Sequence, residues 1–125
     1  HIYSGKFLNE NQFGFTPQKS TIDGFKAMKE FVDQKIKHYN YIAMMSLDVK
    51  GAFDAAWWPS ILTNLKNLGC PQNLNNLSND YFNNRIAILQ ITGYREKKEV
   101  KRGCPQGSCS GPGYWDILYN TLLNL

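Results

Sequence analysis

The order of apolar and polar residues predicts a helix after an irregular opening. Residues 1–19 show no clear period and contain the breakers Gly5, Gly14 and Pro17. Apolar side chains then recur at helical spacing at Ile22, Phe25, Val32 and Ile36. Ser20 or Thr21 stands where a helix cap is expected, so we expect the helix to begin there.

A continuous apolar run follows at residues 41–47, with polar residues on both sides. A short run of this kind is typical of a strand that is buried on both faces. We therefore expect a buried strand at 41–47, with Asp48 at its carboxyl end.

Two further helices are predicted in the middle of the chain. Pro59 suits the first turn of a helix, and Gly69, with Pro71 just beyond it, suits the end of that helix. Its apolar face is made by Ile61, Leu62, Leu65 and Leu68. A second, shorter helix is expected over residues 74–82.

The last third of the chain predicts a hairpin, a loop and a helix. Residues 85–91 and 95–101 read as strands joined by a turn at 92–94, and the charges of the second strand suit an exposed edge. Residues 103–113 are dense in Gly and Pro and read as a loop, and a final helix is expected from about Gly113. This order of elements predicts an α+β fold with a small antiparallel sheet and packed helices.

Composition limits the class of protein without naming its function. The chain has 125 residues, 42% of them hydrophobic, which is enough for one folded domain or a piece of one. Its net charge of +4 permits a polyanionic partner, but a solvated basic surface explains that charge equally well. The odd number of cysteines suggests reduced thiols in an intracellular protein. No apolar run reaches the length of a membrane span, so no membrane partner is expected.

Asp48 is a candidate metal ligand. A carboxylate at the end of a buried strand is costly unless it is paired or binds a metal. Magnesium prefers oxygen ligands and takes few of them from protein when phosphates supply the rest. The alternative is that Asp48 caps the turn at residues 49–52, and position alone does not decide between the two.

The small residues Gly51 and Ala52 leave space in which Phe53 could meet a ligand. An aromatic ring there could stack on a sugar or clash with a 2′-hydroxyl group, which separates ribonucleotides from deoxynucleotides. The alternative, that Phe53 is simply part of the core, is the commoner role of Phe. In the loop at 103–113, Gln106 offers both a donor and an acceptor, whereas the alternative is a plain connection into the next helix.

Three blocks of the chain carry a resemblance when they are taken together. They are QFGFTPQKST at 12–21, LDVKGAFD at 47–54 and RGCPQGS at 102–108, followed by Gly-Pro at 111–112 and WDILYN at 115–120. In order and separation they resemble the reverse transcriptase domain of non-LTR (LINE-type) retrotransposons, most closely the arthropod elements that insert into ribosomal RNA genes. The resemblance implies that residues 1–125 are a partial reverse transcriptase domain, comprising part of the fingers and the first half of the palm.

The resemblance implies a metal site at the end of the second block. Asp48 matches the first catalytic aspartate, which ligates both metal ions in the family. The backbone carbonyl of Val49 would join it on one of them. The implied cofactor is two Mg²⁺ ions for nucleotidyl transfer.

The resemblance also implies the residues that meet the nucleotide. Phe53 matches the aromatic gate that selects deoxynucleotides, with Ala52 beside it. Gln106 and Gly107 match the loop that holds the incoming nucleotide and the template base. Lys19 lies where relatives place a basic residue near substrate or template, whereas Thr16 stands where many relatives carry Arg.

The implied partners are an RNA template, a DNA primer, deoxynucleoside triphosphates and the rest of a retrotransposon polyprotein, in the cytoplasm and nucleus. The family's second pair of catalytic aspartates follows the Gln-Gly loop, but no Asp-Asp pair occurs in this chain. We therefore expect an incomplete domain that is inactive alone. The alternatives are a non-catalytic nucleic-acid-binding relic and a related group II intron or telomerase-type reverse transcriptase.

Overall fold

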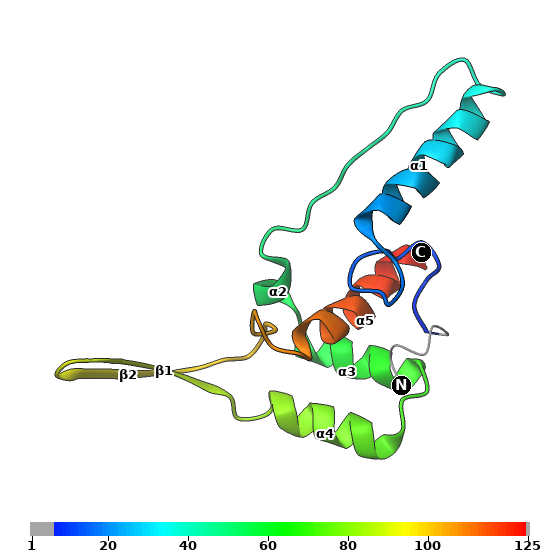
Figure 1. Ribbon diagram of the computed structural model, residues 1–125. Coiled ribbons are helices and arrows are strands. Elements are labelled where there is room, and N and C mark those ends of the chain that lie inside the picture. The colour runs from blue at the N-terminus through cyan, green and yellow to red at the C-terminus, as the bar shows by residue number, and fades with distance from the viewer. Residues whose placement is uncertain (1–6, 125) are drawn as a thin grey trace.

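The computed structural model describes residues 7–124, and three helices gather around its core (Figure 1). These are α3 (Trp58–Asn67), α4 (Gln72–Phe82) and α5 (Gly111–Leu123). Helix α3 packs against both of the others. The side chains buried in this core are Ala56, Trp58, Ile61, Leu65, Phe82, Cys104 and Ile117.

The predicted signals for α3 and α5 are largely confirmed. Pro59 lies in the first turn of α3, and Gly69 follows its end with φ of +71°. That left-handed conformation is one that glycine adopts without strain. Helix α5 begins at Gly111, slightly before the expected Gly113.

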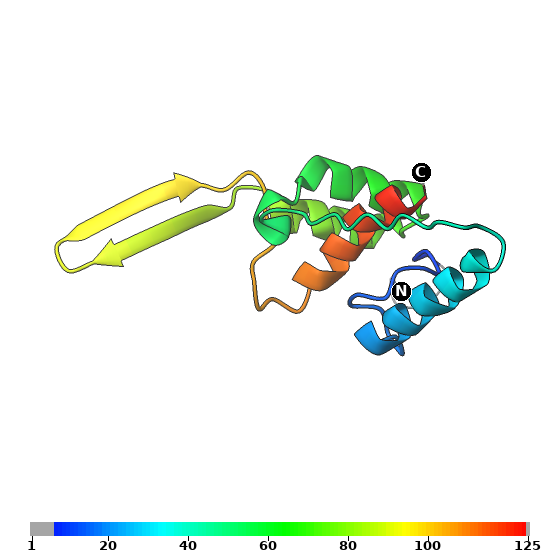
Figure 2. The ribbon, with the colours of Figure 1, turned by 90° about the horizontal axis from the view of Figure 1, so that it is seen from above.

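Helix α1 (Thr21–Ile36) is specified by local signals at its start. The Ser20 side chain accepts a hydrogen bond from the Asp23 amide, and the Asp23 side chain accepts one from the Ser20 amide. This reciprocal pair is a capping box, which satisfies donors that the first turn leaves free. None of the helix is buried, and it extends away from the core (Figures 1 and 2).

The expected buried strand at residues 41–47 is wrong. The segment runs back from α1 to α2 (Ala52–Ala55) as extended chain that belongs to no strand (Figure 1). Tyr41 is 92% exposed and Leu47 is 85% exposed. An apolar run becomes a strand only where a neighbouring strand pairs with its backbone groups. In residues 7–124 the sheet consists of β1 and β2 alone, and neither of them pairs with this segment.

The predicted hairpin is confirmed. Strands β1 (Ile86–Ile91) and β2 (Tyr94–Glu99) pair antiparallel, from Ile86 opposite Glu99 to Ile91 opposite Tyr94. All their residues are exposed, and the ribbon projects from the helical core (Figure 2). Helices packed together beside this small sheet give the α+β fold that the sequence predicted. None of the helices within residues 7–124 combines the length and apolar character needed to cross a membrane.

Candidate nucleotide-binding site

The loop at residues 103–113 is fixed to α2 through backbone hydrogen bonds. The amide of Gly103 donates to the carbonyl oxygen of Ala56 at 2.8 Å, and the amide of Cys104 donates to that of Phe53, also at 2.8 Å. The indole nitrogen of Trp58 donates to the carbonyl oxygen of Gly103 at 2.9 Å. The second and third sequence blocks are therefore joined mainly through backbone groups, and Trp58 supplies the one side chain among these three bonds.

Gly103 is required where the loop meets α2. Its φ of +98° lies in the region that favours glycine. A Cβ atom added there would lie 3.1 Å from the carbonyl oxygen of Asp54. The absence of a side chain thus allows the two backbones to approach each other.

The same loop turns sharply before it enters α5. The amide of Ser108 donates to the carbonyl oxygen of Pro105, and the Ser108 hydroxyl accepts from the amide of Gly111 at 2.9 Å. Gly107 has φ of +80° and has open space around its Cα. This turn leaves Gln106 and Gly107 exposed at its tip.

A cavity of about 490 Å³ brings the three sequence blocks together. Phe15 from the first block meets Phe53 from the second edge to face, with ring centroids 6.0 Å apart. Phe53 also lies 6.0 Å from the ring of Trp115 on α5. The cavity is lined by Phe15, Phe53, Pro105, Gln106, Gly107, Ser108, Cys109 and Pro112.

Three of the predicted site residues, Phe53, Gln106 and Gly107, therefore share one cavity. Ala52 precedes Phe53 at the start of α2 and is half-buried without lining that cavity. Phe15 was missed as a site residue, although it lies inside a block that the sequence singled out. Its side chain could not be assigned from the pattern because its partner, Phe53, is distant in the sequence.

Lys19, by contrast, contacts its own block and not the cavity. Its ammonium group lies 4.9 Å from the centre of the Phe13 ring and donates a hydrogen bond to the carbonyl oxygen of Glu10. Both contacts are made to residues close to Lys19 in the sequence. Its role near substrate or template stays a prediction.

Asp48 and Val49 lie outside this cavity, on the exposed segment that precedes α2. A carboxylate and a backbone carbonyl oxygen have the hard-donor chemistry that Mg²⁺ prefers. Within residues 7–124, however, no group of three or more His, Cys, Asp or Glu side chains is placed to hold a metal ion. The Asp48 carboxylate and the Val49 carbonyl oxygen are therefore ligands of the type that Mg²⁺ binds, but they fill at most part of its coordination shell.

Asp116 is a buried carboxylate that the sequence reading did not assign to a site. It is 1% exposed, and its Oδ2 atom has no hydrogen-bond partner. Burial raises its pKa to about 6, and a hydrogen bond from the Gln12 side chain opposes that rise. The only signal in the sequence was an acidic residue within an apolar helical run, which is weak evidence without knowing what packs on that face.

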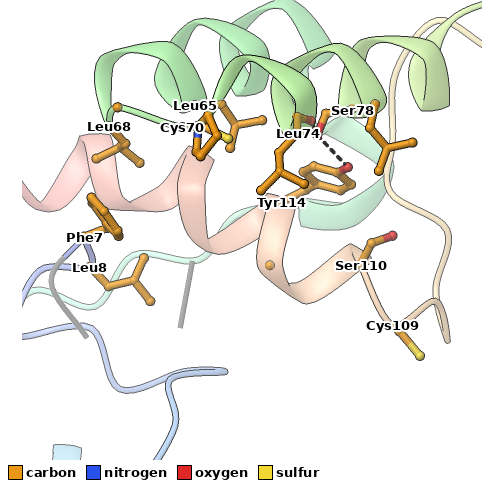
Figure 3. A pocket seen from close by; sticks show the side chains of 14 residues that line it. Phe7, Leu8, Leu65, Leu68, Cys70, Leu74, Ser78, Cys109, Ser110 and Tyr114 are labelled. Carbon is orange, nitrogen blue, oxygen red and sulfur yellow. Dashed lines mark hydrogen bonds between the residues drawn. The ribbon is translucent and has the colours of Figure 1, made fainter. Parts of the chain in front are cut away.

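A second cavity, of about 400 Å³, lies between α3, α4 and α5 (Figure 3). No charged side chain lines it, and its lining includes Leu65, Leu68, Leu74 and Phe7. The hydroxyl groups of Tyr114 and Ser78 lie 3.1 Å apart and bond to each other. A triphosphate would find no cation in this cavity, so its chemistry does not suit a nucleotide.

Comparison with known proteins identifies the family. The chain matches the family described as reverse transcriptase (RNA-dependent DNA polymerase) over residues 1–125. It is 37% identical over 112 residues to a putative 115 kDa protein in the type-1 retrotransposable element R1DM of Drosophila melanogaster. That alignment covers 90% of this chain and 11% of the relative.

Two further relatives agree with this match. A retrovirus-related Pol polyprotein from the type-1 retrotransposable element R1 of Bradysia coprophila is 37% identical over 113 residues, or 90% of this chain and 11% of that protein. An RNA-directed DNA polymerase from the mobile element jockey of Drosophila melanogaster is 29% identical, over 90% of this chain and 12% of that protein. No solved structure shows significant similarity. Because the family match extends over the whole chain, the chain belongs to the reverse transcriptase (RNA-dependent DNA polymerase) family, as its three sequence blocks predicted.

Proposed function

We propose that this chain forms the deoxynucleotide side of the active site in an RNA-directed DNA polymerase of a non-LTR retrotransposon. The observation that carries the proposal is the cavity in which Phe53 meets the loop containing Gln106 and Gly107. Two blocks that are about fifty residues apart in sequence are bonded there backbone to backbone. A nucleotide held between them would contact an aromatic ring on one side and an amide side chain on the other.

In this proposal each residue has a distinct task. The Phe53 ring packs against the sugar and excludes a 2′-hydroxyl group by contact. Gln106 offers hydrogen bonds to the base or backbone, and Gly107 lets the loop approach closely because it carries no side chain. Ala52 leaves room beside the ring, and Lys19 supplies a cation near the substrate or template.

Asp48 and the Val49 carbonyl oxygen would hold part of the metal set. Two Mg²⁺ ions, when bound, would activate the primer 3′-oxygen and stabilise the leaving pyrophosphate. The remaining ligands would come from other parts of the polyprotein, because the chain spans only about 11% of the length of the two R1-element relatives. The 125-residue chain by itself is therefore expected to extend no primer.

The partners that follow are an RNA template, a DNA primer and deoxynucleoside triphosphates. The primer–template would bind electrostatically along the exposed basic residues of the hairpin. Such a polymerase would work inside the cell, in the cytoplasm and the nucleus.

The test uses the longer polymerase protein that contains this chain. Phe53→Val should raise incorporation of a ribonucleotide relative to the matching deoxynucleotide by at least about tenfold, because the contact that rejects the 2′-hydroxyl group is lost. Asp48→Asn should abolish primer extension while leaving the protein folded. Trp57→Phe, an exposed position near α2, is the matched control. Unchanged sugar selectivity in Phe53→Val would refute the assigned role of the ring.

A non-catalytic nucleic-acid-binding module is the second candidate, because the hairpin presents lysines to solvent. It predicts that the longer protein binds a primer–template but that Asp48→Asn changes nothing measurable. The polymerase proposal predicts that this substitution removes extension and preserves binding of the nucleic acid.

A further inference from the structure

Helix α5 holds the N-terminal segment (residues 7–15) through a row of polar side chains. Asn120 accepts a hydrogen bond from the amide of Asn9 at 2.6 Å and donates one to the carbonyl oxygen of Phe7 at 3.0 Å. Near the end of the helix, the Asn9 side chain donates to the carbonyl oxygen of Leu123. The segment lies beside the C-terminal half of α5, in agreement with these bonds (Figure 1).

One turn before Asn120, the same face of α5 presents Asp116 to Gln12. Gln12 is 3% exposed and Asp116 is 1% exposed, so the pair is shut away from water. Each side chain keeps one oxygen without a partner, Oε1 of Gln12 and Oδ2 of Asp116. Two unpaired acceptors are costly in a buried place, and a proton on Asp116 would turn one of them into a donor.

This buried pair lies three residues from the ring that closes the nucleotide cavity. Phe15 follows Gln12 along the segment and meets Phe53 edge to face at 6.0 Å. Phe15 has φ of +52°, which residues with a side chain seldom adopt. Such a conformation persists where surrounding contacts hold it. The hydrogen bonds that tie this segment to α5 involve Phe7, Asn9 and Gln12, and Gln12 is the nearest of them to Phe15 along the chain.

We propose that Gln12 and Asp116 form a positioning pair that holds Phe15 against Phe53, and that this closed state, in which the pair is buried, is favoured when the Asp116 carboxyl group carries its proton. This inference rests on the proposed function, because the cavity whose width α5 would regulate is the proposed nucleotide cavity. Neither residue touches the cavity itself. Both act through Phe15.

The direction of the pH effect follows from burial. Burial raises the pKa of Asp116 from 3.8 to about 6, so the closed state binds the proton more tightly than an open state in which water reaches the carboxyl group. The closed state is thus favoured at low pH, and this preference is lost as pH rises through 6. The charged groups on the elements that pack against α5 are Asp54 on α2 and Lys66 on α3. The N-terminal segment adds Glu10, and Lys19 bonds to its carbonyl oxygen. The causes of the shift in the pKa of Asp116 are burial and the hydrogen bond from Gln12.

The experiment measures amide hydrogen exchange of residues 9–15 at pH 5 and at pH 7.5, corrected for the intrinsic rate at each pH. The equilibrium constant for opening that exposes Asp116 should rise about tenfold between these two pH values, because the pKa of Asp116 is about 6 in the closed state and 3.8 when water reaches the carboxyl group. The same measurement on Asp116→Asn should show no such change. Asp80→Asn, an exposed carboxylate on α4, is the control and should keep the response.

A second readout follows Phe15 itself, labelled as 4-fluorophenylalanine at that position and observed by fluorine NMR. Its signal should titrate near pH 6 in the unsubstituted chain and stay fixed in Asp116→Asn. If the exchange protection of residues 9–15 does not change with pH in the unsubstituted chain, the inference is overturned, and no variant is needed to show it. Protection that titrates while the Phe15 signal does not would overturn the positioning role. Neither readout depends on nucleotide, so failure of nucleotide binding at every pH would instead sink the proposed function.

Discussion

At the scale of single residues, the contact between Gly103 and α2 should control the stability of the cavity wall. An added Cβ atom would lie 3.1 Å from the carbonyl oxygen of Asp54, in a backbone conformation that L residues avoid. Gly103→Ala should therefore lower the free energy of unfolding by about 2–3 kcal/mol, from strain and crowding together. Urea denaturation followed by tryptophan fluorescence measures the loss.

The matched control is Gly107→Ala in the same loop. Gly107 also has a left-handed φ, but nothing lies within 4 Å of the added Cβ atom. Its cost should be the strain alone, about 1 kcal/mol. Equal losses in the two variants would show that the close approach of Gly103 to α2 contributes nothing to stability.

The residue scale is also where sequence reasoning about the site was least complete. The sequence identified Phe53, Gln106 and Gly107, and the structure places all three around one cavity. It did not identify Phe15 or the pairing of Gln12 with Asp116. Those roles depend on which distant segments meet, and a local pattern of residue types carries no information about that.

At the scale of elements, α1 tests how far local signals can hold a helix. It buries no residue, so its stability rests on its cap and on pairs such as the salt bridge from Lys29 to Asp33 at 2.7 Å. Ser20→Ala should cost about 1 kcal/mol of local helix stability, because the hydroxyl that accepts from the Asp23 amide is lost, while the amide of residue 20 can still donate to the Asp23 side chain. Amide exchange across α1 should rise selectively. Thr21→Ala, in the first turn, is the control and should leave exchange nearly unchanged.

The elements that the sequence predicted well are those with signals inside their own length. Pro59 and Gly69 bounded α3, and the turn around Gly93 joined two antiparallel strands as the predicted hairpin requires. The run at residues 41–47 failed for the opposite reason. Its apolar content requires burial, but pairing requires a second strand from elsewhere, which local pattern cannot supply. In the described structure all of its side chains except that of Ile42, which is half-buried, therefore remain exposed.

At the scale of the whole molecule, the projecting hairpin separates its charges onto two faces. Successive strand residues point to opposite sides of a sheet. One face of β2 therefore carries Arg95 and Lys97 with Glu99, and the other carries Lys98 with Glu96. The first face has an excess of positive charge, and the second is balanced.

This asymmetry predicts which face meets the phosphates of a primer–template. Lys97→Ala should weaken binding and reduce the slope of log K against log salt by somewhat under one, about 0.7–0.9, because one phosphate contact is lost. Lys98→Ala, its neighbour on the balanced face, should leave both affinity and slope nearly unchanged. Fluorescence anisotropy of a labelled RNA–DNA hybrid over a range of KCl concentrations measures both quantities. Equal effects from the two lysines would mean that the ribbon binds no phosphate through one face, and the hairpin would then contribute only general positive charge.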